Sequence, residues 1–147
     1  MDPLPDALEA YRELAQRFDT YILSTAPWHN ASAWHDKVLW VQKHLGLTSE
    51  SVAYKRLILS HHKNLNRGDF LVDDRSANGA GEFEGEWLQF GPDAAYPSWA
   101  SVTDYLLLTG HGAGRGEGRL GGDRHGDLEQ EATLVLRLHD RQRAAVR

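Results

Sequence analysis

Two adjacent carboxylates, Asp73 and Asp74, directly follow the apolar run Phe70-Leu71-Val72. A continuous apolar run of this kind is typical of a buried parallel strand, and α/β folds bind ligands at the carboxyl ends of such strands. Adjacent carboxylates repel each other unless a cation or a base lies nearby, and Mg²⁺ is bound through carboxylate oxygens. The pair therefore predicts a divalent-cation site at the carboxyl edge of a sheet.

Hydroxyl and ammonium groups follow two earlier apolar runs. Ser24 and Thr25 come directly after residues 21–23, and Lys63 follows residues 57–59 across a short polar stretch. Hydroxyls and backbone N–H groups at such a turn can cradle phosphate oxygens, and a lysine can offset the charge of a phosphoryl group. Each also has an ordinary role, because Ser and Thr are common turn residues and a lysine in a polar loop is usually solvated. The order hydroxyl, lysine, acidic pair makes the combination informative, since response-regulator receivers use the same groups with the acidic pair first.

The eight histidines show no ligand-like spacing. His61 and His62 are adjacent, so on a strand they would point to opposite faces, and no His-Glu-x-x-His pair is present. We interpret the histidines as solvent or packing residues. Trp28 is different, because it follows Pro27 just after the hydroxyl pair, and it is a candidate for the rim of the site.

The bulk composition indicates one acidic globular domain. The 147 residues are 41% hydrophobic and carry a net charge of −5, with a pI near 5.9, which argues against nucleic acid polymers and anionic membranes as partners. The absence of cysteine excludes disulfides, Cys-ligated zinc and thiol catalysis. No signal-peptide pattern is present at the beginning of the sequence. We therefore expect a cytoplasmic protein whose partner is a small molecule.

Apolar periodicity predicts an α/β domain with a mostly parallel sheet and helices packed on it. In the second predicted helix, Ser32 is the expected N-cap and Gly46 the stop, and the expected buried face includes Trp34 and Val38. The predicted elements, in chain order, are a helix over 6–17, a strand over 20–23, a helix over 32–45, strands over 57–59, 70–72 and 87–90, and a helix over 98–108.

The composition changes abruptly after Leu108. Eight of the 17 residues from 110 to 126 are glycine, which leaves too little apolar surface to offset the entropy lost on ordering. We therefore predict a domain over 1–109, a disordered linker over 110–126 and a candidate C-terminal helix over 127–147. In this last segment Leu128, Ala132, Val135 and Leu138 recur at helical spacing.

Three segments carry a resemblance to known proteins: Ile22-Leu23-Ser24-Thr25-Ala26-Pro27, His62-Lys63-Asn64-Leu65 and Leu71-Val72-Asp73-Asp74-Arg75. In this order they resemble the haloacid-dehalogenase-like (HAD-like) phosphatases, and within them the 5′(3′)-deoxyribonucleotidase family. The similarity spans roughly residues 5–99. It implies a partial Rossmann-like fold of three layers, in which a parallel sheet is flanked by helices.

The resemblance also implies roles for individual residues. Ser24 would bind the phosphate, with Thr25 beside it, and Lys63 would offset the charge on the phosphoryl group and the nucleophile. Asp73 and Asp74 would hold Mg²⁺ as the cofactor. The implied substrate is a phosphomonoester, namely a (deoxy)nucleoside monophosphate.

The sequence also departs from the family pattern. The pattern opens with an apolar strand that ends in Asp-x-Asp, whose first Asp attacks phosphorus, followed by a small helical cap that selects the nucleotide. Neither feature is present in this sequence. By lineage the chain would be a Mg²⁺-dependent phosphomonoesterase that works through an aspartyl phosphate, inactive because the nucleophile is missing. Two alternatives stay open: a non-catalytic module that binds phosphate or nucleotide, and a truncated gene product.

The strand order of the family has a structural consequence as well. The missing first strand would lie between the strands at 20–23 and 70–72. Without it, both strands would lose a ladder partner and expose apolar edges, which invites pairing with another chain. We therefore expect a marginally stable chain that tends to self-associate.

Overall fold

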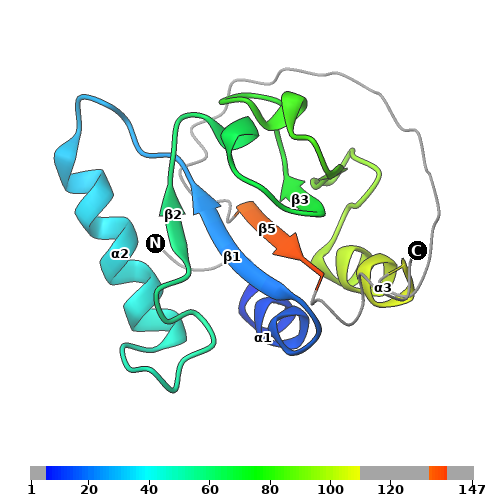
Figure 1. Ribbon diagram of the computed structural model, residues 1–147, viewed down its shortest axis with the longest axis horizontal. Coiled ribbons are helices and arrows are strands. Elements are labelled where there is room, and N and C mark those ends of the chain that lie inside the picture. Colours follow the sequence, from blue (N-terminus) through cyan, green and yellow to red (C-terminus); the bar gives the residue numbers. More distant parts are fainter. Residues whose placement is uncertain (1–5, 110–132, 139–147) are drawn as a thin grey trace.

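The computed structural model describes residues 6–109 and 133–138 (Figure 1). Every element predicted before residue 109 is present, close to its predicted bounds, and the predicted α/β fold with a mostly parallel sheet is confirmed. The elements are α1 (Ala7–Arg17), β1 (Asp19–Ser24), α2 (Ala31–Leu45), β2 (Leu57–Leu59), the 3₁₀ turn η1 (Lys63–Leu65), β3 (Phe70–Asp73), the 3₁₀ turn η2 (Ala80–Glu82), β4 (Glu86–Gln89), α3 (Trp99–Thr109) and β5 (Thr133–Arg137).

The five strands form one sheet in the order β2-β1-β5-β3-β4. The outer pairs β1–β2 and β3–β4 are parallel, and β5 runs antiparallel to both of its neighbours. α1 and α3 pack side by side against one face of the sheet, and α2 flanks the edge strand β2 (Figure 1). Because β5 is antiparallel to β1 and to β3, these two strands run in the same direction, and their carboxyl ends lie at the same edge of the sheet.

The helix predicted over 127–147 is wrong at its centre, because Thr133–Arg137 form β5. The run Leu134-Val135-Leu136 suits both a buried strand and one face of a helix, and periodicity alone does not separate these readings. The position between β1 and β3, which the sequence led us to expect vacant, is occupied by this strand. The rest of the predicted helix and the predicted glycine-rich linker lie outside the described residues.

β5 is fully integrated in the core. Leu134, Val135 and Leu136 are 1%, 2% and 0% exposed; Leu134 and Leu136 join the larger core under α1 and α3, whereas Val135 faces a smaller core with Leu23 and Leu71 on the other side of the sheet. A Cβ on Gly68 would lie 2.4 Å from Cγ2 of Val135, so only glycine fits at that approach. The exposed edges expected for β1 and β3 are therefore closed.

Two details of α2 differ from the sequence prediction. Asn30 is the N-cap, accepting a hydrogen bond from the backbone N of Ala33 at 3.3 Å, whereas Ser32 donates to the Asn30 side chain. Val38 is 40% exposed instead of buried, and Trp34 is only half-buried. The reason is that α2 lies at the outer edge of the sheet and buries only Val41 and Leu45, in its C-terminal half.

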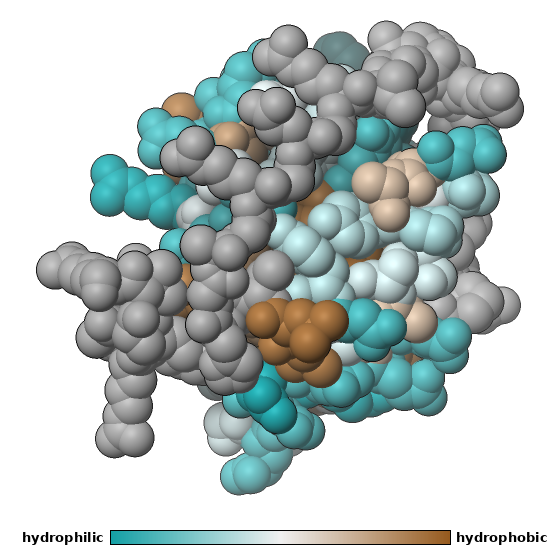
Figure 2. All heavy atoms as spheres, turned by 90° about the vertical axis from the view of Figure 1, so that its right-hand side faces the viewer, coloured by the Kyte–Doolittle hydropathy of each residue, from teal (hydrophilic) through white to brown (hydrophobic). Residues whose placement is uncertain are grey.

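The surface on the α3 side is largely hydrophilic, with one compact hydrophobic patch (Figure 2). Among the described residues, no helix is long and apolar enough to cross a membrane.

The packing of β5 predicts a large cost for truncating its side chains. Leu136→Ala removes a fully buried side chain from a strand with neighbours on both sides, so we expect the free energy of unfolding to fall by about 2–5 kcal/mol, measured by urea denaturation. Leu47→Ala is the matched control, because Leu47 is 66% exposed and its loss should cost less than about 0.5 kcal/mol. Equal stabilities of the two variants would mean that β5 is not part of the folded core in solution.

Candidate functional site

The carboxyl edge of the sheet brings together the groups that the sequence singled out. Ser24 ends β1, Asp73 ends β3, and Lys63 opens η1 in the connection from β2 to β3. Since β2 lies on the outer side of β1, and β3 on the far side of β5, this connection must cross the ends of β1 and β5. It thereby carries Lys63 from one half of the sheet to the other.

Lys63 and Asp73 form a buried ion pair. The Lys63 Nζ lies 2.6 Å from Oδ2 of Asp73, and the two side chains are only 8% and 2% exposed. The backbone N of Lys63 donates to the carbonyl of Asn78 at 2.7 Å, which ties η1 to the loop after β3. This loop turns through left-handed conformations at Asn78 (φ 53°) and Gly79 (φ 81°), where a Cβ on Gly79 would clash with Asn64. Close packing of the two loops therefore holds Lys63 against Asp73.

The pKa of Asp73 is raised from 3.8 to about 6, mainly because the carboxyl is buried; the Lys63 ammonium opposes this shift and the nearby Asp74 adds to it. At neutral pH the carboxylate is therefore ionised and faces a cation. Its second oxygen, Oδ1, accepts a long hydrogen bond of 3.4 Å from the backbone N of Arg75. The Trp87 indole donates to the backbone carbonyl of Asp73 at 3.1 Å and so anchors the end of β3.

The residues present fit a Mg²⁺ site built on the acidic pair. Asp74 is 13% exposed and lies 3.5 Å from the Arg75 guanidinium, and the Lys63 ammonium contacts Oδ2 of Asp73. Mg²⁺ is commonly held by one or two carboxylates, with water and substrate phosphate as its other ligands. Within residues 6–109 and 133–138 there is no cluster of three or more His, Asp or Glu side chains that could hold a metal. A Mg²⁺ ion at this edge would therefore rest on Asp73 and Asp74, with water and substrate supplying its other ligands.

The hydroxyl pair lies at the same edge but is held by other partners. Lys37, on α2, donates to Oγ of Ser24 at 2.8 Å, and the Thr25 hydroxyl donates to the carbonyl of Ser60 at 2.8 Å. Lys37 is a residue that the sequence analysis missed. It lies three residues after Trp34 and four before Val41, which places it on the helix face directed at β1, and this spacing was the available signal.

Two tryptophans that follow the hydroxyl pair in the chain lie against His61. Trp28 is 78% exposed, and its ring centroid lies 6.1 Å from that of His61. Trp34 lies 5.4 Å from the same imidazole and donates through its indole N–H to the carbonyl of Pro27. Trp28 is thus exposed and in contact with His61, and its place at the rim of the site stays a prediction.

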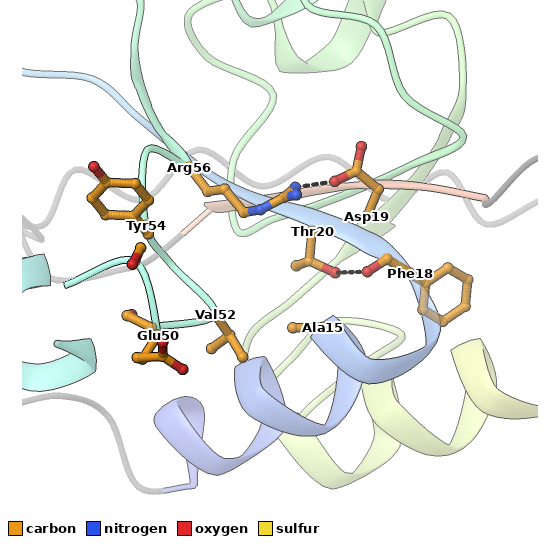
Figure 3. Close-up of a pocket in the computed structure, with 10 residues that line it drawn as sticks. Ala15, Phe18, Asp19, Thr20, Glu50, Val52, Tyr54 and Arg56 are labelled. Atoms are coloured by element: carbon orange, nitrogen blue, oxygen red, sulfur yellow. Dashed lines mark hydrogen bonds and ion pairs between the residues drawn. The ribbon is translucent and has the colours of Figure 1, made fainter. Parts of the chain in front are cut away.

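A pocket of about 430 Å³ lies at the opposite edge of the sheet, where β1 begins. Asp19 and Thr20 of β1 line it together with Arg56, Tyr54 and Glu50 from the loop before β2, and the Arg56 guanidinium pairs with Asp19 (Figure 3). The Arg56 guanidinium and the Asp19 carboxylate of this pocket are engaged with each other, and Lys63 and Asp73 do not line it. We therefore place the candidate site at the carboxyl edge and not in this pocket.

A mostly parallel α/β sheet with a hydroxyl, a buried lysine and an acidic pair after successive strands defines a HAD-like phosphatase core. Comparison with known proteins agrees with this class. The sequence model of the family described as 5′ nucleotidase, deoxy (pyrimidine), cytosolic type C protein matches residues 1–93, which is more than half of the chain. The chain belongs to this family.

Individual relatives carry the same kind of name. A putative 5′(3′)-deoxyribonucleotidase of Vibrio phage KVP40 is 56% identical over 106 residues, which cover 72% of this chain and 59% of the phage protein. One from Bordetella bronchiseptica is 38% identical over 97 residues, covering 65% of this chain and 50% of the relative. The human 5′(3′)-deoxyribonucleotidase, cytosolic type, is 34% identical over 79 residues, covering 51% and 36%. The matches thus span only about a third to three fifths of these relatives' lengths.

The buried pair predicts a strong dependence of stability on both partners. Lys63→Met leaves the Asp73 carboxylate buried without its cation, so we expect the free energy of unfolding to fall by about 3–5 kcal/mol. The double variant Lys63→Met with Asp73→Asn should recover most of this loss, because neither charge then remains. Urea denaturation of the two single variants and the double variant measures the coupling. Additive losses would show that the two side chains do not interact in solution.

The raised pKa of Asp73 predicts a pH dependence of stability. The folded state retains a proton on Asp73 up to about pH 6, whereas the ordinary value is 3.8. Stability contributed by this proton is therefore fully present below about pH 4 and is lost as the pH rises to about 6. In Mg²⁺-free buffer, the free energy of unfolding of the wild type minus that of Asp73→Asn should fall across this window and level off above it. A difference that rises with pH would contradict the assignment.

Proposed function

We propose that the chain is the phosphate- and Mg²⁺-binding core of a 5′(3′)-deoxyribonucleotidase-type phosphatase that acts on (deoxy)nucleoside monophosphates. The observation that carries this proposal is the buried pair of Lys63 and Asp73 at the carboxyl edge, at 2.6 Å. Burying a lysine is costly, and its position beside an acidic pair suits the neutralisation of a bound phosphoryl group. The printed names of the relatives support the same substrate class. The name of the human relative, cytosolic type, supports a cytoplasmic location.

Each residue has a distinct role in this proposal. Because Lys37 donates to the oxygen of Ser24, the Ser24 proton is free to be donated to a phosphate oxygen, and Thr25 supplies the adjacent backbone N–H. Lys63 offsets the negative charge of the phosphoryl group. Asp73 and Asp74 would hold Mg²⁺, which when bound supplies further neutralisation of the phosphate.

Hydrolysis through an aspartyl phosphate requires a nucleophilic carboxylate. No two aspartates in the 147 residues are separated by a single residue, so the printed sequence contains no Asp-x-Asp motif. We therefore propose that this chain by itself binds the phosphomonoester without turning it over, which favours the binding-module alternative for the isolated polypeptide.

Phosphate binding is tested by calorimetric titration with 2-deoxyribose 5-phosphate in Mg²⁺ buffer. Ser24→Ala removes a donor to a charged group, so we expect roughly tenfold weaker binding. Ser49→Ala is the matched control, because Ser49 lies at the opposite edge of the sheet, and its affinity should match that of the wild type. Equal affinities of the two variants would remove Ser24 from the phosphate site.

Catalytic competence is tested with dUMP and with p-nitrophenyl phosphate. We expect the chain to release phosphate no faster than a buffer control that contains Mg²⁺, because Ser24, Lys63 and Asp73 can position a phosphate but cannot attack it. Turnover by the pure wild type that disappears in Lys63→Ala would show that another side chain acts as the nucleophile.

A further inference from the structure

The two carboxylates of the acidic pair are adjacent in the chain, and one cation can use both only if they point the same way. Successive side chains of a strand point to opposite faces of the sheet, so a continued strand would separate Asp73 from Asp74. β3 ends at Asp73, and a hydrogen bond between the two aspartate side chains contributes to the raised pKa of Asp73. The chain therefore leaves strand geometry at the peptide that joins the two aspartates.

The carbonyl of this peptide is held from two directions. The Asp73 carbonyl oxygen accepts a hydrogen bond from the backbone N of Phe90 at 3.0 Å and another from the indole N–H of Trp87 at 3.1 Å. A carbonyl oxygen has two lone pairs, so both are used. The Phe90 bond continues the ladder between β3 and β4, whereas the Trp87 bond comes from a side chain and is additional to the ladder.

The packing of Trp87 fixes the direction from which its indole reaches this carbonyl. Trp87 lies opposite Leu71 in the register of β3 and β4. Its half-buried ring packs against the smaller core, which contains Leu23, Leu71 and Val135. Because these apolar contacts hold the ring in place, a rotation of the peptide after Asp73 would deprive the indole N–H of its acceptor, which is unfavourable.

We propose that Trp87 is a positioning residue for the cation site, whose indole fixes the peptide between Asp73 and Asp74 so that both carboxylates face one Mg²⁺ ion. Mg²⁺ demands nearly ideal octahedral geometry, and groups that orient its ligands without touching the ion contribute to its affinity. The proposal rests on the Mg²⁺ site of the function proposed above. It makes that site more specific, because it assigns the orientation of the ligands to a side chain that acts through the backbone.

The first test compares the binding of Mg²⁺ and Ca²⁺ to the full chain, followed by ¹H–¹⁵N NMR titration of the backbone amide signals of Asp74 and Arg75. Trp87→Phe keeps an aromatic ring but removes the N–H, so we expect about tenfold weaker Mg²⁺ binding. Ca²⁺ accepts a more flexible geometry, so its affinity should change by less than about threefold. Asp74→Asn removes a charged ligand and should weaken the binding of both ions.

Trp99→Phe is the matched control. The Trp99 side chain is buried, and its indole N–H has no hydrogen-bond partner among the described residues, so the same substitution removes no hydrogen bond there. Its Mg²⁺ affinity should match that of the wild type. Urea denaturation of both variants establishes that they are folded under the titration conditions. Equal weakening of Mg²⁺ binding in the two variants would attribute the effect to lost packing and overturn the positioning role.

The second test needs no variant and follows the indole N–H signals of the wild-type chain during the same Mg²⁺ titration. The Trp87 signal should shift with the half-saturation point of the amide signals, because its acceptor carbonyl lies between the two carboxylates. The Trp99 signal should stay in place. A Trp87 signal that does not move at saturating Mg²⁺ would overturn the positioning role, even if Trp87→Phe fails to fold.

The outcomes separate this role from the proposed function. An unchanged Mg²⁺ affinity in Trp87→Phe, or equal weakening of Mg²⁺ and Ca²⁺, would overturn the positioning role and leave the Mg²⁺ and phosphate sites in place. Selective weakening of Mg²⁺ in a chain that does not bind 2-deoxyribose 5-phosphate would remove the phosphate site and leave the positioning role standing. If the wild type binds no Mg²⁺, the metal site and the role of Trp87 both fail.

Discussion

The pairing of β1 and β3 with a strand that lies between them is the constraint on which the rest of the structure depends. Two strands that run in the same direction and lie in the middle of a sheet must each pair on both sides, because unpaired backbone groups in the core are costly. β5 pairs with both strands through one short segment, Thr133–Arg137. Its apolar side chains enter the cores on the two faces of the sheet. With one strand between them, β1 and β3 are held about 10 Å apart, and this spacing sets the separation of Ser24 from Asp73.

The buried pair of Lys63 and Asp73 is the second long-range tie across this sheet. Lys63 belongs to the connection after β2, yet it reaches the end of β3, so the pair spans the ends of β1 and β5 at the carboxyl edge. Taking both charges out of water is expensive, and this cost can exceed the Coulombic attraction between them, whereas removing one partner alone is strongly destabilising. Here it holds the Lys63 ammonium beside the acidic pair Asp73 and Asp74 at the carboxyl edge.

The antiparallel direction of β5 determines which of its ends lies at the carboxyl edge of the sheet. Its first residues, and not its last, lie at the carboxyl edge, where Thr133 is paired with Leu23 of β1. In the described part of β5, the side chains that follow, Leu134, Val135 and Leu136, are apolar and buried. Among the described residues, the hydroxyl, lysine and acidic groups at this edge come from the ends of β1 and β3 and from the connection after β2.

Local patterns by themselves determined much of this protein. The apolar runs before Ser24, Lys63 and Asp73 specified three parallel strands, and the order of the polar residues after them identified the family, because strand ends place side chains at one edge in any parallel sheet. Three features were decided only by the tertiary structure. The segment 133–137 became a strand because pairing with β1 and β3 outweighs its helical periodicity. Val38 stayed exposed because α2 lies at the edge of the sheet. Lys37 joined the site because the packing of α2 against β2 directs its helix face toward Ser24. In each case the deciding partner is distant in the sequence, and short-range patterns carry no information about such contacts.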